Sequence, residues 1–149
     1  MVAAATPPYG AGMTRASLLT LSLLLCLAAA LPASASALRG FKTPSGNIHC
    51  QGYGGEVRCD IRRTTNGKPP RPAWCDFDYG TGYATKPGWK RGKRLCVSDT
   101  VYDAGHRALA YGASWRYGSV TCRSRMAGLT CRNGGGHGFF LSIGSQRVF

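Results

Sequence analysis

The sequence has few acidic residues and lacks the motifs of several enzyme classes. Six of the 149 residues are Asp or Glu against 19 Lys and Arg, so the formal net charge is +13. The motifs G-x-S-x-G, H-E-x-x-H and G-x-x-x-x-G-K-(S/T) do not occur. No basic helix of a known DNA-reading motif is present. These absences favour a non-enzyme, and the charge favours anionic partners.

Long apolar runs are also missing. The longest run, Leu18–Leu31, has 14 residues, which is short of the ~20 that a membrane-spanning helix needs. Arg15 precedes the run, and alternating small residues follow it up to Ala37. This order is typical of a secretory signal peptide.

We therefore expect residues 1–37 to be a signal peptide, with Met13 as an alternative true start. The mature chain would then be one domain, residues 38–149, without a transmembrane segment. Removal of Arg15 leaves a net charge of +12, so the basic character belongs to the mature domain. The predicted location is extracellular or cell-wall associated.

The cysteine count is odd, and the signal peptide accounts for the odd residue. Cys26 lies in the apolar run, after Leu25 rather than the small residue that lipoprotein processing requires, so we expect it to be removed with the signal. An even number of cysteines in a short exported chain predicts disulfides. The six remaining cysteines are Cys50, Cys59, Cys75, Cys96, Cys122 and Cys131.

The first two of these cysteines bracket a predicted hairpin. Gly54-Gly55 suits a two-residue β-turn, and counting outward from it places Cys50 opposite Cys59. Such a non-hydrogen-bonded pair has Cα atoms about 4.5 Å apart, within the reach of a disulfide. The same register places Ile48 and Val57 on one face with the cysteines.

A second segment, residues 118–131, repeats the pattern G-x-(I/V)-x-C-x6-(V/L)-x-C of residues 46–59. It predicts a Cys122–Cys131 disulfide, with a four-residue loop from Arg125 to Gly128. Cys75–Cys96 follows by elimination. A duplication or the shared geometry of hairpins would explain the repeat. The C-x8-C spacing differs from the C-x2-4-C of zinc sites, so no metal or other cofactor is expected.

Short alternating segments separated by glycine and proline predict the rest of the fold. A turn is expected at Tyr79–Gly82, and no stretch has the sustained 3.6-residue periodicity of a helix. The predicted class is all-β: a small antiparallel meander or sandwich-like domain stapled by three disulfides. The other expected strands are Arg39–Lys42, Trp74–Asp78, Leu95–Val97, Ala108–Tyr111, Trp115–Cys122 and Phe139–Ile143.

Five segments of the mature chain together carry a family resemblance: Phe41–Cys50, Val57–Ile61, Leu109–Gly112, Gly128–Asn133 and Gly136–Ser142. They resemble an uncharacterised family of small exported domains common in actinobacteria, a domain of unknown function. The resemblance covers nearly the whole mature chain and implies export and a six-cysteine framework. It implies no catalytic residue.

The strongest candidate binding segment is Lys86–Arg94, in which five basic residues surround one tryptophan. The cations could hold phosphates or other anions while the indole stacks on sugars or bases. A solvated loop with the tryptophan packed inward is the competing interpretation. The candidate residues are Lys86, Trp89, Lys90, Arg91, Lys93 and Arg94.

Three other residues suggest a small secreted hydrolase as an alternative. Asp76 and Asp78 would share a strand face, as the carboxylates of glycosidases do, and His137 could be a general base. His49 and Asp60 are expected to form a surface ion pair on the outer face of the first hairpin.

The sequence thus predicts an exported binding module that captures an anionic envelope polymer or surface electrostatically. A small hydrolase, or a secreted inhibitor or effector that binds a protein partner, are the alternatives.

Overall fold

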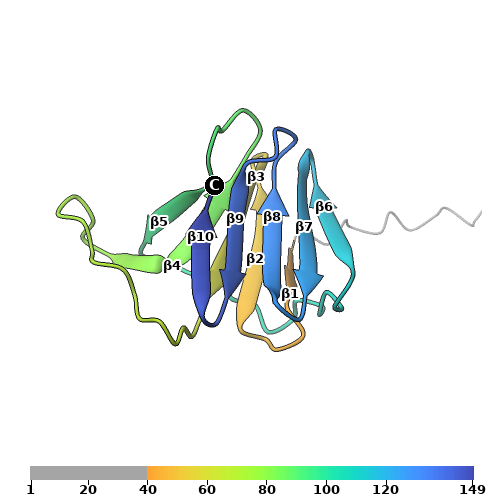
Figure 1. Cartoon of the computed structure of the whole chain (residues 1–149), viewed down its shortest axis with the longest axis horizontal. Helices are drawn as coiled ribbons and strands as arrows, with labels where there is room; N and C mark the ends of the chain where they lie inside the picture. Colours follow the sequence, from red (N-terminus) through yellow and green to blue (C-terminus); the bar gives the residue numbers. More distant parts are fainter. Residues whose placement is uncertain (1–39) are drawn as a thin grey trace, which may run out of the picture. The chain divides into compact units, whose positions relative to one another are not determined.

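The computed structural model describes residues 40–149, which form two antiparallel sheets of five strands each (Figure 1). The expected signal peptide lies outside these residues. Within them no helix is long and apolar enough to cross a membrane.

The first sheet has the order β1-β2-β3-β4-β5 and the second the order β10-β9-β8-β7-β6, so both are meanders. The all-β class and its antiparallel topology are therefore confirmed. The strands of the first sheet are β1 (Gly40–Lys42), β2 (Ile48–Tyr53), β3 (Glu56–Ile61), β4 (Asp78–Thr85) and β5 (Lys93–Val97). Those of the second are β6 (Ser114–Tyr117), β7 (Val120–Arg125), β8 (Gly128–Arg132), β9 (Gly138–Ser142) and β10 (Ser145–Val148).

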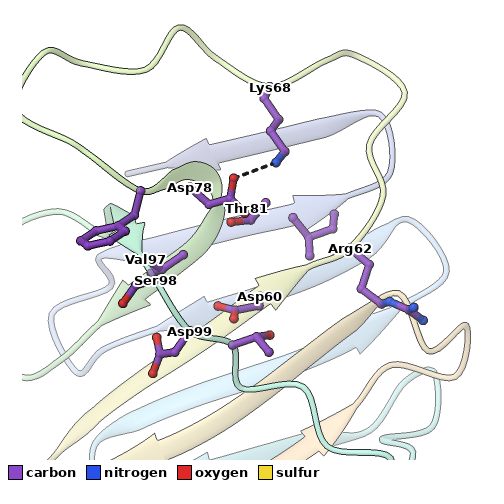
Figure 2. A pocket seen from close by; sticks show the side chains of 11 residues that line it. Asp60, Arg62, Lys68, Asp78, Thr81, Val97, Ser98 and Asp99 are labelled. Atoms are coloured by element: carbon purple, nitrogen blue, oxygen red, sulfur yellow. Dashed lines mark hydrogen bonds and ion pairs between the residues drawn. The ribbon is translucent and has the colours of Figure 1, made fainter.

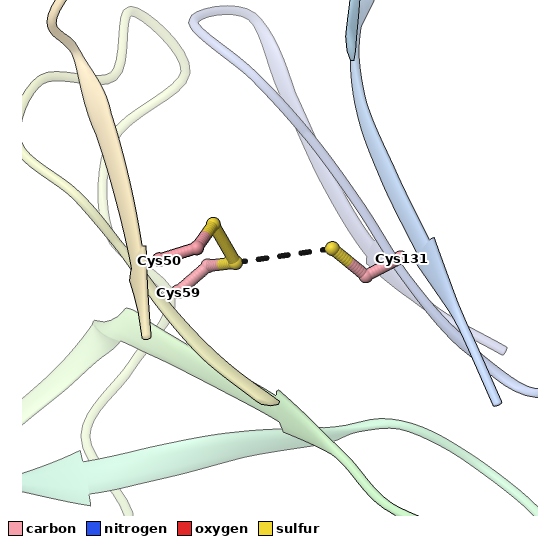
Figure 3. A group of neighbouring side chains, drawn as sticks. All are labelled: Cys50, Cys59 and Cys131. Atoms are coloured by element: carbon pink, nitrogen blue, oxygen red, sulfur yellow. Dashed lines mark hydrogen bonds between the residues drawn. A yellow bond between two sulfur atoms is a disulfide. The ribbon is translucent and has the colours of Figure 1, made fainter. Parts of the chain in front are cut away.

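Disulfides join the predicted pairs: Cys50–Cys59, Cys75–Cys96 and Cys122–Cys131. The first and third cross the hairpins β2–β3 and β7–β8 with Cα atoms 4.0 Å apart. All four of these cysteines are fully buried between the sheets. There the Sγ atoms of Cys59 and Cys131 lie 3.9 Å apart, so the two disulfides meet at the centre of the core (Figure 3).

The two sheets repeat one another beyond the hairpins. Cys59 is paired with Tyr83 on β4, and Cys131 occupies the matching position opposite Phe139 on β9. Likewise Cys50 is opposite Phe41, as Cys122 is opposite Trp115.

Matching residues also contact each other across the core. The ring centroids of Phe41 and Trp115 are 5.0 Å apart, and those of Tyr83 and Phe139 are 6.2 Å apart. Two sheets that agree in strand order, register and core contacts favour duplication of a five-stranded unit over a coincidence of hairpin geometry.

The prediction of a turn at Tyr79–Gly82 is wrong, because β4 runs through this segment. Gly80 has a φ of +92° and lies where the β4–β5 register shifts between Tyr79 and Tyr83. A Cβ on Gly82 would meet the side chain of Val97 at 3.0 Å. Gly80 therefore allows an irregularity in the strand, and Gly82 leaves room for a neighbouring side chain. Glycines in these two roles cannot be told from turn glycines in the sequence alone.

Residues 108–125 also differ from expectation. Trp115–Cys122 is a hairpin rather than one strand, because Gly118, with a φ of +55°, turns the chain between β6 and β7. Ala108–Tyr111 forms no strand, and its one ladder contact is a parallel bridge from Ala108 to Lys42. The β7–β8 loop has two residues instead of four, since Arg125 is paired with Gly128.

Two further strand predictions need correction. The segment Trp74–Asp78 lies outside the sheet except for Asp78, the first residue of β4. β10 was not predicted, because Ser145–Val148 is short and lacks an apolar alternation.

The connection from β5 to β6 covers the outer face of the first hairpin. The backbone N–H groups of Val101 and Asp103 donate to Asp60 Oδ2 (3.0 Å) and His49 Nδ1 (3.3 Å). Farther along, Leu109 N donates to the carbonyl of Lys42 on the edge strand β1 (2.8 Å). This segment therefore satisfies an edge strand that would otherwise offer unpaired backbone groups.

Candidate functional site

The basic segment Lys86–Arg94, which we call the Trp89 loop, comprises the connection between β4 and β5 and the first two residues of β5, Lys93 and Arg94. Trp89 is half-buried, and the Nζ atoms of Lys86 and Lys93 lie 5.0 Å and 4.2 Å from its ring centroid. Each distance is within the range of a cation–π interaction. The loop therefore combines one indole with two lysine cations, and Lys90 beside them is exposed.

Asn133, in the turn between β8 and β9, holds this loop in place. Its side-chain Nδ2 donates to the carbonyls of Lys86 (2.9 Å) and Trp89 (2.8 Å). Its Oδ1 accepts from the backbone N–H groups of Gly135 and His137, both at 3.0 Å. Because Asn133 is only 5% exposed, this buried amide connects the second sheet to the basic loop.

The two arginines of the loop point to different neighbours. Arg91 donates to the carbonyl of Val148 (3.2 Å), which brings it beside β10. Arg94 is half-buried, and its Nε donates to the hydroxyl of Tyr83 (3.3 Å). Burial acts to lower the pKa of Arg94, but hydrogen bonds to Tyr83 and Tyr79 outweigh it and raise the pKa. Arg94 is thus committed to two tyrosines, unlike the exposed cations of the loop.

A pocket of about 540 Å³ lies on the outer face of the first sheet, away from the Trp89 loop (Figure 2). Three carboxylates line it, those of Asp60, Asp78 and Asp99. Lys68, which also lines the pocket, forms an ion pair with Asp78 at 3.3 Å.

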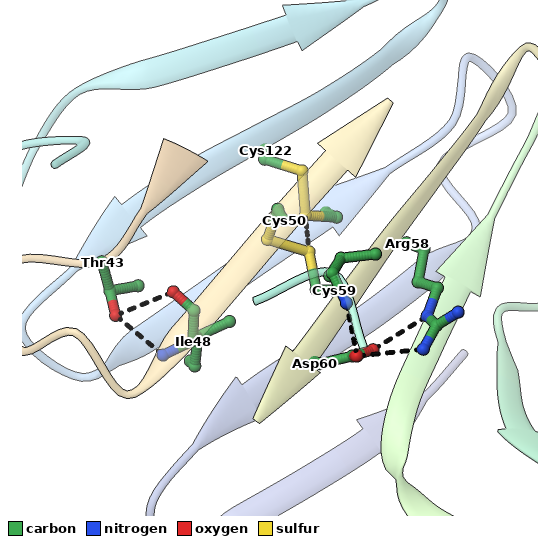
Figure 4. Close-up of a disulfide and its surroundings, with 9 residues drawn as sticks. Thr43, Ile48, Cys50, Arg58, Cys59, Asp60 and Cys122 are labelled. Carbon is green, nitrogen blue, oxygen red and sulfur yellow. Dashed lines mark hydrogen bonds and ion pairs between the residues drawn. A yellow bond between two sulfur atoms is a disulfide. The ribbon is translucent and has the colours of Figure 1, made fainter. Parts of the chain in front are cut away.

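Arg58 holds the other two carboxylates. Its Nε and Nη1 bind Asp60 and Asp99 at 2.9 Å and 2.8 Å, and Figure 4 shows the Asp60 part of this network beside the central disulfide. The hydrogen bond and the charge of Arg58 hold the pKa of Asp99 below its ordinary value. Burial acts to lower the pKa of the Arg58 guanidinium, but the hydrogen bonds and charges of Asp60 and Asp99 outweigh it and raise the pKa. All three pocket carboxylates are therefore paired with cations, which suits a structural role better than proton donation.

Comparison with known proteins identifies the family. The model of a family of unknown function, DUF6636, matches residues 19–149. The chain belongs to this family. No curated protein and no solved structure matches the chain.

In this family member the three residues suggested for a hydrolase lie apart. Asp78 begins β4, whereas Thr85 at the other end of that strand donates to the carbonyl of His137 (3.2 Å). An eight-residue strand separates its ends by about 20 Å. Asp76 precedes the strand, so it does not share a strand face with Asp78. His137 and either aspartate are therefore too far apart to act on the same bond of a substrate.

The expected surface ion pair between His49 and Asp60 is also wrong. The two residues are cross-strand neighbours, as the hairpin register requires, but both are buried. His49 packs on the ring of Tyr102, with centroids 3.7 Å apart, while Asp60 pairs with Arg58. The β5–β6 connection that covers them comes from a segment more than forty residues away, which hairpin geometry does not reveal.

The central cysteines form the one group in residues 40–149 with the proximity of metal ligands. The sulfurs of Cys50, Cys59 and Cys131 lie within 4.8 Å of one another (Figure 3). All three are in disulfides, so they offer no thiolate, the form that binds metals. Their arrangement belongs to the core.

Sequence reasoning overlooked the arginines of the second sheet. After Asp103 the chain contains six arginines but no lysine, aspartate or glutamate. The acid-free stretch and the alternation of Arg123 and Arg125 with buried Cys122 and Ser124 on β7 are signals that could have drawn attention to them.

Proposed function

We propose that this domain is an exported binding module that captures an anionic polymer or surface of the cell envelope or its surroundings. The exposed part of the Lys86–Arg94 loop is the primary contact. The observation that carries the proposal is the arrangement of Trp89 between Lys86 and Lys93, anchored by Asn133. The anionic groups of the ligand contact the lysines, and the indole packs against its sugar or base.

Two properties support this function. A loop already held by two side-chain hydrogen bonds loses less conformational entropy on binding than a free loop does. The net charge, +13 for the whole chain and +12 without residues 1–37, attracts polyanions from a distance.

The signal-like sequence of residues 1–37 and the three disulfides support export. An actinobacterial envelope is the setting that the sequence resemblance suggests. Detection of the protein in the culture medium or wall fraction, with its mature N-terminus determined, tests this part of the proposal.

Salt-titrated binding tests the function. The full chain is mixed with isolated wall polymer, DNA or anionic liposomes, and affinity is followed as NaCl rises. We expect binding to at least one of them that weakens with salt, because counterion release drives it. If the protein binds none of the three ligands, or binds them with an affinity that does not change with salt, the proposal is contradicted.

A charge-matched pair of variants locates the contact. The loop variant carries Lys86→Gln, Lys90→Gln and Lys93→Gln. The control carries Arg63→Gln, Arg71→Gln and Arg107→Gln, three exposed arginines whose side chains form no hydrogen bond or ion pair within residues 40–149. Both variants lose three charges, so a loss of affinity confined to the loop variant assigns the contact to the loop.

A protein partner is a second candidate, favoured by an exposed aromatic pair. Trp74 and Phe77 are 67% and 57% exposed, and they flank Cys75 of the Cys75–Cys96 disulfide. Exposed aromatic residues on a disulfide-held segment are typical of inhibitor and effector contacts. A pull-down from culture medium that depends on Trp74 and Phe77 but not on salt would favour this candidate.

A further inference from the structure

The outer face of the second sheet presents a set of arginines that the Trp89 loop does not include. They are Arg123 and Arg125 on β7, Arg132 on β8 and Arg147 on β10, and all four are exposed. We call them the arginine face. Figure 1 shows this sheet in blue shades in front of the other.

Strand register places these arginines among hydroxyl and aromatic side chains. Arg123 is opposite Thr130, which is opposite Phe140, which is in turn opposite Arg147. In the neighbouring row Arg132 is opposite Thr121. Four adjacent strands span about 14 Å at the usual strand spacing, so the cations cover a broad surface.

Two adjoining depressions lie on this face. One of about 340 Å³ is lined by Thr121, Arg123, Arg125, Thr130 and Arg132. The other, of about 300 Å³, shares Thr130 and Arg132 and continues to Phe140, Arg147 and Phe149. Together they form a shallow surface that an extended ligand can follow across the strands.

Within residues 40–149, no arginine of this face forms an ion pair. Arg123 Nε donates to Ser114 Oγ (3.3 Å), and Arg132 donates to the carbonyl of Gly136 (2.9 Å). The guanidinium carbons of Arg132 and Arg147 lie 4.4 Å and 5.0 Å from the ring centroids of Phe149 and Phe140. These contacts restrain the side chains and leave their charges uncompensated.

On the first sheet, by contrast, Arg58 of β3 pairs with two aspartates, and Lys68 in the β3–β4 connection pairs with a third. Neighbouring like charges on a sheet disfavour the folded state. An unneutralised arginine face therefore has no evident benefit for stability, and an anionic ligand would supply the missing charge.

We infer that the arginine face binds a linear polymer of phosphodiesters. Its donors are all guanidinium or hydroxyl groups, and a guanidinium fork binds two oxygens of one phosphate. The charges lie on three strands, β7, β8 and β10, so a small anion contacts few of them while a chain with repeated phosphates contacts them all. The inference rests on the proposed function for its ligand class, but it assigns binding to other residues.

The two depressions suit either of two sources of the same chemistry. A polyol phosphate would use the arginines and threonines alone. A single-stranded nucleic acid would also stack its bases on aromatic side chains such as Phe140 and Phe149. The choice of probes below separates these sources.

The test compares three variants of the full, disulfide-bonded chain by fluorescence anisotropy. The face variant carries Arg123→Gln, Arg132→Gln and Arg147→Gln, and the loop and control variants are those described above. The probes are labelled poly(glycerol phosphate) and a thymidine oligonucleotide of about twenty nucleotides. Polyglutamate of matched charge serves as the carboxylate competitor.

We expect the face variant to bind the phosphate probes at least about tenfold more weakly than wild type at ~50 mM salt, with the log–log salt slope reduced by about 2. The control variant should keep near-wild-type affinity. Tighter binding of the oligonucleotide than of poly(glycerol phosphate) indicates base stacking, and the reverse indicates a polyol phosphate. Either order supports the inference.

A loss in the face variant alone supports the inference and removes the Trp89 loop as the contact. Two results would overturn the inference. Unchanged affinity in the face variant, with a loss in the loop variant, removes the inference and leaves the proposed function standing. No binding of the wild type to either phosphate probe, or equal competition by polyglutamate, removes the phosphodiester assignment.

A lysine version of the face variant tests the bidentate geometry. Arg123→Lys, Arg132→Lys and Arg147→Lys preserve the charge but remove the fork. We expect affinity between that of the wild type and that of the glutamine variant. Wild-type affinity would contradict bidentate recognition, and thermal unfolding of every variant confirms that it is folded.

Discussion

At the scale of single residues, two buried polar side chains do what apolar packing cannot. Asn133 accepts two hydrogen bonds within the β8–β9 turn and donates two to the carbonyls of Lys86 and Trp89, which join the turn to the Trp89 loop. His49 accepts from Asp103 and thereby attaches the β5–β6 connection to β2. The bonds from Asn133 to the loop and from Asp103 to His49 each join segments more than forty residues apart.

Asn133→Ala should loosen the Trp89 loop. The substitution removes four partly buried hydrogen bonds of the Asn133 side chain, at a cost of about 1–3 kcal/mol in the free energy of unfolding. Urea denaturation measures the cost, and faster hydrogen exchange of the Trp89 amide reports the loosened loop. Asn66→Ala, an exposed position without a side-chain hydrogen bond within residues 40–149, is the control. Equal effects of the two changes would contradict the anchoring role.

His49 makes stability depend on pH. Burial lowers its pKa, and the nearby charges of His106 and Lys42 lower it further. The unfolded chain therefore binds the proton at higher pH than the folded chain does, and stability falls as pH drops through about 6.5 towards the lower folded pKa.

As the pH is lowered from about 8 to about 5, the free energy of unfolding of the wild type should decline. The decline should be smaller in His49→Gln, and urea denaturation at each pH measures both. His137→Gln should leave it unchanged, because His137 is half-buried without a side-chain hydrogen bond in the described part of the chain. An unaltered pH profile in the His49 variant would show that other groups cause the decline.

At the scale of elements, the hairpins β2–β3 and β7–β8 are local units that meet through their disulfides. The loop that each disulfide closes is short, so loop entropy alone gives them less stabilisation than it gives Cys75–Cys96. In the chain-entropy model the values are about 2.7 kcal/mol for each hairpin and about 3.4 kcal/mol for the longer loop. Packing makes the hairpin disulfides the more stabilising ones, because their sulfurs are fully buried and those of Cys59 and Cys131 contact each other across the core.

Removing Cys122–Cys131 with two alanines should therefore destabilise the domain more than removing Cys75–Cys96 does. The core variant loses loop constraint and also leaves a cavity between the sheets, which adds about 1–3 kcal/mol. Urea denaturation of both variants measures the difference. A larger loss for the Cys75 and Cys96 variant would show that loop length outweighs packing.

At the scale of the whole molecule, charge is divided unevenly between the sheets. All six acidic residues lie between Glu56 and Asp103, and the second sheet has none. Arg58 on the first sheet consequently has carboxylate partners, whereas no arginine of the arginine face forms an ion pair within residues 40–149, so these arginines repel one another.

Neutralising arginines should affect stability differently on the two sheets. Arg58→Gln leaves the buried Asp60 without its charged partner and should cost about 2 kcal/mol. Arg123→Gln and Arg147→Gln should change the free energy of unfolding by about 0.5 kcal/mol at most, with a gain at low salt. Thermal unfolding at low and high NaCl measures both effects. A large loss of stability in Arg123→Gln or Arg147→Gln would show that the arginine has a structural role.

The sequence by itself determined the parts that depend on local geometry. The Gly54-Gly55 turn sets the register that places Cys50 opposite Cys59, and strand alternation identifies the buried faces. Within the β4–β5 loop, the cluster of lysines around Trp89 was also visible, because its members are close in sequence.

Tertiary structure decided the features that join distant segments. The covering of His49 and Asp60 by the β5–β6 connection, the anchoring of the loop by Asn133 and the row from Arg123 to Arg147 all depend on sheet order. Strand alternation is a local property with a period of two residues, but the neighbour of a strand depends on how the whole chain minimises exposed apolar surface and unpaired backbone groups. The fold class could therefore be predicted from the sequence, whereas the surfaces available for binding required the assembled sheets.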